Sequence, residues 1–157
     1  MIPRLLLLIL FVVALLVVAA LWEKCRERSL RRWAGRRPGA NLHWGFVPEE
    51  HPGLPVGELI HGIIGQPPMG YASALQLAGP TGDLWFVEYR TTPPGRKSDR
   101  WFTLLALPCA DETSAQECLT HLQTSRPAQL PRLVGNWVCL RLEGLMSVRL
   151  LESHLGI

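Results

Sequence analysis

Cysteine and histidine are the residues of this chain best suited to chemistry, because thiolates and imidazoles serve as nucleophiles, general bases and metal ligands. The 157 residues include four cysteines and five histidines. Cys118 and His121 are spaced as two ligands of a metal site can be, but no second pair of this kind lies nearby. We therefore predict no metal site and no cofactor, and we interpret Cys118 and Cys139 as small buried residues and Cys109 as a loop residue.

A nucleophile with a nearby base is the alternative interpretation of the same residues. Cys118 could act with one of four histidines, and Ser98–Asp99 beside a histidine could belong to a hydrolase. No local motif supports either arrangement: GxSxG, a phosphate-binding loop and HExxH are absent, and Gly62-Ile-Ile-Gly65 is only a short GxxG. We therefore predict no catalytic residue and no enzymatic activity, with a membrane-tethered, hydrolase-like enzyme as the alternative. The four histidines are His43, His51, His61 and His154.

An apolar run at the N-terminus must position whatever follows it. From Leu5 to Leu21 the chain has no charged, polar or helix-breaking residue. At about 1.5 Å per residue, the run through Trp22 forms a helix of about 27 Å, close to the thickness of a hydrocarbon core. We predict a transmembrane anchor over residues 1–22. The alternative is a signal peptide cleaved after Ala20, which would release a secreted domain, but the length of the run and the bulky residues after Ala20 favour the anchor.

Residues 23–40 form a basic juxtamembrane neck. Residues 1–43 carry a net charge of +6, whereas residues 44–157 carry −3, so the folded part offers no broad basic surface for nucleic acid. We predict that the neck continues the helix to about Trp33, before Gly35 and Pro38. Its cations are candidates for contact with anionic lipid headgroups or serve only to fix the topology. These membrane-surface candidates are Lys24, Arg26, Arg28, Arg31, Arg32, Arg36 and Arg37.

The charges that flank the span also predict its orientation. Seven Lys and Arg residues follow Trp22 within fifteen residues, whereas Arg4 and the terminal amine precede the span. Because basic flanks resist translocation, we expect the domain to be cytoplasmic. A single span, a basic neck and a small sheet domain resemble many bacterial inner-membrane proteins, so we expect that location. Were the orientation reversed, a Cys109–Cys118 disulfide would be plausible.

Residues 41–157 are expected to form an α+β domain that folds alone. Alternating or branched apolar residues in YASALQLAG, DLWFVEYRT and RWFTLLALP predict three antiparallel strands in a meander, and LVGNWVCLRLEG predicts a fourth. In the second of these strands the alternation places Glu88 on the face of Leu84 and Phe86. We therefore expect a mainly antiparallel sheet of four to five strands with one to two helices.

Helical periodicity is clearest between Ala110 and Pro127, where Ser114 and Glu117 form a possible capping box and Pro127 ends the segment. ELIHGIIG predicts a short helix at best, and the stretch before it reads as an extended connector. The C-terminal tail fits a helix or a strand, and we favour a strand near Ser147–Leu151.

These features predict where the protein acts, at a membrane, but do not indicate a reaction. We expect a single-span accessory or interaction subunit that presents its domain to a membrane-protein partner, with the bilayer holding the anchor. The loop Pro93–Arg100 is the one locally basic part of the domain and could meet phosphates or lipid headgroups, or simply be solvated.

Overall fold

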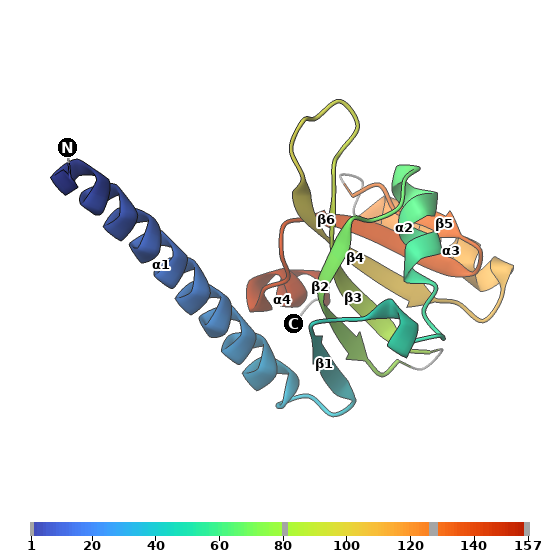
Figure 1. Cartoon of the computed structure of the whole chain (residues 1–157). Helices are drawn as coiled ribbons and strands as arrows, with labels where there is room; N and C mark the ends of the chain where they lie inside the picture. The colour runs from blue at the N-terminus through green and yellow to red at the C-terminus, as the bar shows by residue number, and fades with distance from the viewer. Residues whose placement is uncertain (1, 80–81, 126–128, 156–157) are drawn as a thin grey trace.

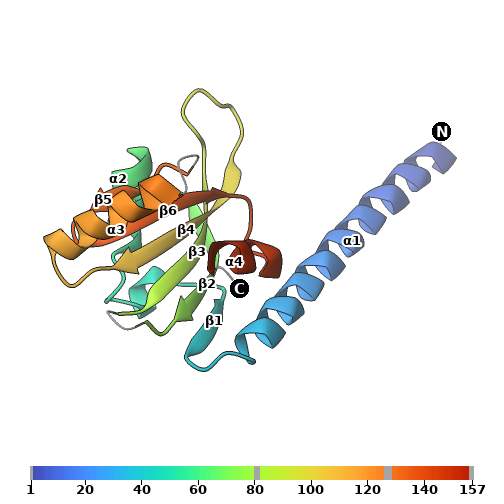
Figure 2. The same cartoon turned by 180° about the vertical axis from the view of Figure 1, so that it is seen from behind.

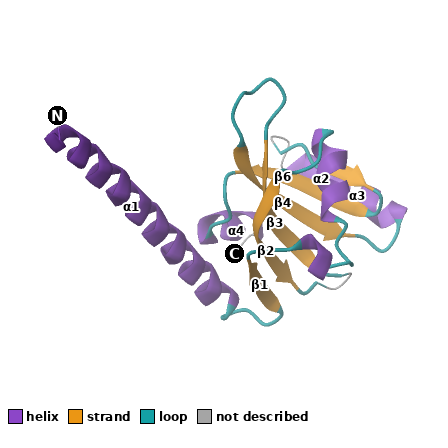
Figure 3. Ribbon diagram, in the orientation of Figure 1, coloured by secondary structure: helices purple, strands orange, loops and turns teal. Residues whose placement is uncertain are grey.

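The computed structural model describes residues 2–79, 82–125 and 129–155 and confirms the α+β class. A long N-terminal helix leads into an antiparallel sheet with three further helices (Figures 1 and 3). In chain order the elements are α1 (Ile2–Ala34), β1 (Ala40–Trp44), the 3-10 turn η1 (Pro48–Glu50), α2 (Val56–Ile64), β2 (Gly70–Leu77), β3 (Leu84–Thr91), β4 (Arg100–Pro108), α3 (Glu112–Ser125), β5 (Arg132–Val134), β6 (Trp137–Glu143) and α4 (Val148–Leu155).

Helix α1 has two parts with different surroundings. The side chains of Leu5–Trp22 are exposed, and this part extends away from the rest of the molecule (Figures 1 and 2). The helix is long and apolar enough to cross a membrane, a property that a signal sequence shares. Beyond Trp22 the helix continues without a break to Ala34, close to the predicted end near Trp33, and the rest of the neck is not helical. Gly39 then turns the chain into β1 with a φ of 77°, and a Cβ there would lie 2.7 Å from that of Ala78.

The sheet has the order β1-β2-β3-β4-β6-β5 and every neighbouring pair is antiparallel. Strands β2, β3 and β4 form the predicted meander, and β6 is the predicted fourth strand. Among the described residues the sheet has six strands, slightly more than the four to five expected. The additional strands are β1, in the stretch interpreted as a connector, and the three-residue β5, which gains its partners only by pairing with β6.

A β-bulge in β2 corrects the simple alternation read from the sequence. Tyr71 is opposite Tyr89, but Ala74 is opposite Val87, so β2 has one residue more than β3 across this interval. As a result, Tyr71 packs in the same core as Ala74, whereas Ser73 and Leu75 turn to the other face of the sheet.

The sheet separates two apolar cores. One face packs against α2 through Val56, Leu59 and Ile60. The other face packs against the end of α1, against Met146 and against α4. Helix α3 contacts β5 and β6, and its apolar side forms a smaller cluster around Ala115 and Val138.

Two local predictions about the helices are wrong. The tail forms α4 rather than a strand: Ser147 Oγ accepts a hydrogen bond from Leu150 N at 3.2 Å, and Leu151 is fully buried in the second core. The residue that caps α3 is Asp111, whose carboxylate accepts a hydrogen bond from Ser114 N at 2.7 Å. The described helices after α1 therefore number three, not one to two. Pro127, predicted to end α3, lies outside the described residues.

Candidate functional site at the junction of α1 and the sheet

Glu88 is a fully buried carboxylate in the middle of β3. The alternation of the strand places Trp85, Val87 and Tyr89 in the α2-side core and turns Glu88 to the face where α1 ends. A charge in such a place is costly unless donors surround it. Glu88 is therefore the residue around which the junction must be built.

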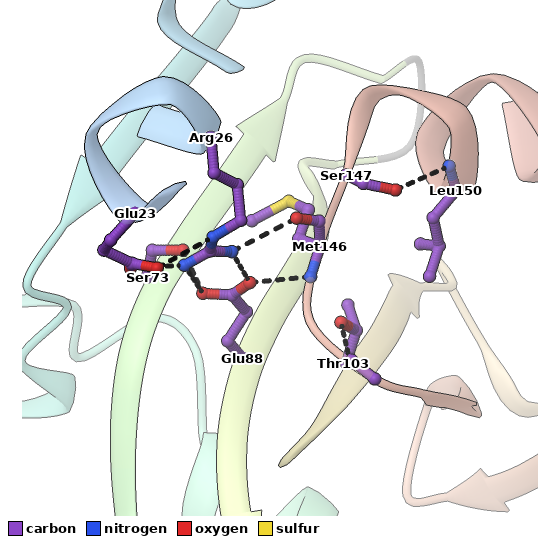
Figure 4. Close-up of polar contacts among 9 residues, drawn as sticks. Glu23, Arg26, Ser73, Glu88, Thr103, Met146, Ser147 and Leu150 are labelled. Atoms are coloured by element: carbon purple, nitrogen blue, oxygen red, sulfur yellow. Dashed lines mark hydrogen bonds and ion pairs between the residues drawn. The ribbon is translucent and has the colours of Figure 1, made fainter. Parts of the chain in front are cut away.

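Four donors from three separate parts of the chain meet this carboxylate (Figure 4). Arg26 of α1 donates through both terminal nitrogens, with Nη2 at 3.3 Å from Oε2. Ser73 Oγ donates at 2.5 Å, and the backbone nitrogen of Met146 donates at 2.6 Å. The β-bulge in β2 matters here because it is what turns Ser73 toward Glu88.

Arg26 is also buried, although slightly less completely than Glu88. Its side chain is 7% exposed, and it also donates to Glu23 Oε1 at 2.7 Å and to the carbonyl of Met146 at 3.1 Å. Its guanidinium carbon lies 4.8 Å from the centre of the Trp44 ring and 5.7 Å from that of Trp22. The forked guanidinium thus connects one turn of α1 to β3, β1 and the segment before α4.

Apolar residues on the same side of α1 complete the junction. Leu30, Trp33 and Ala34 are buried in the core that contains Phe86, Leu140 and Leu151. Together with Arg26 they recur at the three- and four-residue spacing of one helix face. The neck is therefore amphipathic: one face belongs to the interior of the domain, and the opposite face carries exposed cations.

An open groove of about 900 Å³ lies beside the ion pair. One wall is the α1 stripe from Trp22 to Leu30. The other walls are the start of β4, including Trp101, and the segment Glu143–Arg149. The groove therefore runs along α1 from the end of its apolar part toward the domain.

The predicted membrane-surface cations are divided by this geometry. Arg26 is directed into the domain, Arg31 pairs with Glu27 at 2.7 Å, and the guanidinium of Arg37 lies 3.8 Å from the centre of the Trp33 ring. The remaining four cations are exposed, and contact with headgroups remains a prediction for them. They are Lys24, Arg28, Arg32 and Arg36.

The residues considered for catalysis lie in separate places. His43 stacks on Trp85, and His51 lies edge-on to both rings, with 4.4 Å between the two imidazole centres. Cys118 packs in the α3 cluster next to Cys109. Burial raises the pKa of Cys118, so its reactive thiolate form is disfavoured near neutral pH. Among the described residues, no group of three or more His, Cys, Asp or Glu side chains is arranged to hold a metal ion.

The Glu88 carboxylate is occupied by four donors from within the chain. What it can do is fix the direction of α1 relative to the sheet. Sequence reasoning did not select Glu88 as a site residue, although an acidic side chain inside an otherwise apolar strand is the signal that could have found it.

Comparison with known proteins identifies no similar protein. The chain matches no protein-family model, and neither the search of curated proteins nor that of solved structures finds a match.

Proposed function

We propose that this protein is a single-span accessory or interaction subunit of a bacterial inner membrane, with its α+β domain on the cytoplasmic side. The observation that supports this proposal best is the continuity of α1. One uninterrupted helix carries an exposed apolar half and a half whose residues belong to the core of the domain. An anchor joined in this way holds the domain in a defined orientation rather than on a flexible tether.

A fixed orientation suits a protein that acts through contact. Anchoring raises the effective concentration of the domain toward neighbouring membrane proteins to about the millimolar range, so a modest surface suffices for binding. The groove at the junction has apolar walls and lies next to the apolar part of α1, where a membrane-protein partner would approach.

The exposed face of the neck supports a second contact, with anionic headgroups. If Trp22 marks the headgroup level, Lys24 and Arg28 lie about 3 and 9 Å beyond it along the helix axis. Arg32 lies about 15 Å beyond it, nearly twice the screening length of about 8 Å in physiological salt, and Arg36 follows the end of α1. We therefore assign the headgroup role chiefly to Lys24 and Arg28, and the fixing of topology to the whole cluster.

Two experiments test the proposal. A reporter fused after Ile157 should be active in the cytoplasm, and sodium carbonate should leave the full chain in the membrane fraction. A mature N-terminus that begins after Ala20 would instead support the secreted alternative.

Purification in a mild detergent should then recover at least one integral membrane protein with this chain. Cys118→Ala and His121→Ala should leave that association intact, because neither residue lines the junction groove. A clean monomer, together with loss of a cellular phenotype in Cys118→Ala alone, would favour the tethered enzyme instead.

A further inference from the structure

The β3–β4 loop, residues 92–99, extends from the domain on the side toward which α1 leaves it. In Figures 1 and 2 the loop rises from the sheet in the general direction of the N-terminal half of α1. Its base is close to α1 in space, since Asp99 and Arg100 line the same groove as Trp22 and Cys25. The loop and the apolar half of α1 therefore extend to the same side of the sheet domain.

Hydrogen bonds hold the base of this loop in shape. Gln66 Nε2 donates to Thr91 Oγ1 at 2.9 Å and to the carbonyl of Thr92 at 2.5 Å. Thr92 Oγ1 donates to Asp99 Oδ1 at 2.6 Å, and Arg96 N donates to the carbonyl of Pro93 at 3.0 Å. The direction of the loop is thus set by contacts on both of its sides.

The charges of the loop are unevenly compensated. Its only carboxylate, Asp99, accepts from Thr92 and lies 3.9 Å from Arg90. Arg96 and Lys97 of the loop are exposed, as is Arg100 at the start of β4, and none of the three has an acidic partner among the described residues. The loop therefore presents cations without counterions at its tip, a charge that complements a surface of lipid phosphates.

We propose that the β3–β4 loop is a second membrane contact, which places Arg96 and Lys97 on the anionic headgroups of the leaflet where α1 ends. This inference rests on the proposed anchoring of α1. With Trp22 at the headgroup level, the groove that begins at Trp22 and the β3–β4 loop both face the membrane surface. The domain is then held at two points, by the α1 neck and by the loop, and cannot turn freely about the helix axis.

The test uses the full chain in nanodiscs of phosphatidylcholine, with and without about one third phosphatidylglycerol. A nitroxide is attached at Ser98→Cys after Cys25, Cys109 and Cys118 are changed to Ser; Cys139 is kept because it is 1% exposed. Collisions of the nitroxide with a water-soluble nickel chelate should fall several-fold in the anionic discs. High salt should reverse the effect, because it screens exposed charges.

Lys97→Glu should restore the collision rate in anionic discs to its value in neutral discs, whereas Arg132→Glu should leave the decrease unchanged. Arg132 is an exposed residue of β5, outside the loop and the groove, and its replacement changes the net charge by the same amount. A label on Thr120→Cys in α3 should stay equally accessible in both lipids.

Four results would overturn the inference. A label at residue 98 that is equally accessible in both lipids would exclude the contact, while incorporation into the discs would leave the anchor intact. If the nitroxide at residue 98 were protected from the nickel chelate equally well in neutral discs, recognition of anionic headgroups would be excluded. If it were protected only when another protein copurifies, the loop would be assigned to that partner. Failure of the chain to enter discs at all would overturn both the anchor and the inference.

Discussion

At the scale of single residues, the junction depends on how one buried carboxylate is neutralised. Glu88 accepts from Arg26, Ser73 and the backbone of Met146, so α1, β2 and the segment before α4 each contribute a donor. A buried ion pair of this kind adds little to stability compared with apolar residues of the same shape, but breaking it on one side is costly. The contribution of the Arg26–Glu88 pair is to specify one orientation of α1 relative to the sheet.

Arg26→Ala should destabilise the protein by about 3–5 kcal/mol, because it leaves the Glu88 carboxylate buried with a charge and no cation. Arg31→Ala is the matched control: Arg31 forms an exposed pair with Glu27, worth about 0.3–0.5 kcal/mol. The measurement is chemical unfolding of the full chain in detergent, followed by tryptophan fluorescence.

A double-variant cycle identifies the cause of that loss. Glu88→Leu should recover part of the stability in the Arg26→Ala background, because it removes the unpaired charge. Equal losses for Arg26→Ala and Arg31→Ala would show that the pair is not buried in solution.

Tyr89 gives a prediction that depends on pH. Burial raises its pKa from the ordinary value near 10 to about 12, so the folded state favours the protonated phenol. The associated stability is fully present below pH 10 and is lost as the pH rises toward 12. In Tyr71→Phe, whose only remaining tyrosine is Tyr89, tyrosinate absorbance should stay low until the pH approaches 12 or the protein unfolds.

Tyr89→Phe should be neutral or stabilising at neutral pH. The Tyr89 hydroxyl is buried and has no hydrogen-bond partner among the described residues, so its removal relieves an unpaired polar group. Thermal unfolding measures the effect, and a clear decrease in melting temperature would reveal a partner for the hydroxyl, such as a bound water.

At the scale of elements, the start of α3 distinguishes two capping arrangements. The sequence offers Ser114 and Glu117 as a capping box, but Asp111 supplies the acceptor for Ser114 N. The hydrogen bond from the Ser114 backbone, together with the one from the Ser114 side chain, lowers the pKa of Asp111. The cap is therefore present above the ordinary pKa of an aspartate and is lost as the pH falls through the lowered value.

Asp111→Ala should lower the melting temperature more than Ser114→Ala, because Ser114→Ala removes only the side-chain donor and retains the backbone donor of the cap. The difference between the two variants should shrink under acidic conditions, where Asp111 is protonated. Thermal unfolding by circular dichroism at neutral and acidic pH checks both statements. A larger loss for Ser114→Ala would restore the capping box.

At the scale of the whole molecule, the junction changes where the domain begins. The sequence suggested a domain over residues 41–157, but Leu30, Trp33 and Ala34 belong to its second core. Burying a side chain such as leucine contributes about 1.5–3 kcal/mol, a large share of the marginal stability of a small domain. The smallest unit that retains both cores therefore begins near residue 23.

A fragment of residues 23–157 should accordingly be soluble and unfold cooperatively, whereas residues 41–157 should be less stable by several kcal/mol. The shorter fragment loses the apolar cover of the sheet and leaves Glu88 without Arg26. Urea unfolding of the two fragments measures the difference. Equal stability would show that the end of α1 is only loosely packed on the sheet.

The sequence by itself determined those parts of the protein that depend on neighbouring residues. The run Leu5–Trp22 and the breakers after Trp33 predicted α1 and its end, and period-two alternation predicted the meander and the two faces of β3. The α3 segment was also predicted from its periodicity. Each of these features is local, since hydrophobic spacing and turn residues act within a few positions of one another.

Only the tertiary structure decided which neck residues face the domain and what neutralises Glu88. Arg26 and Glu88 are 62 positions apart, and Met146 is 58 positions beyond Glu88, so no local pattern joins them. In the sequence Arg26 was one of seven similar cations, and the tail fitted both a helix and a strand, of which we favoured the strand. Packing against the second core made the choice in both cases, because a helix face is buried only where another surface meets it.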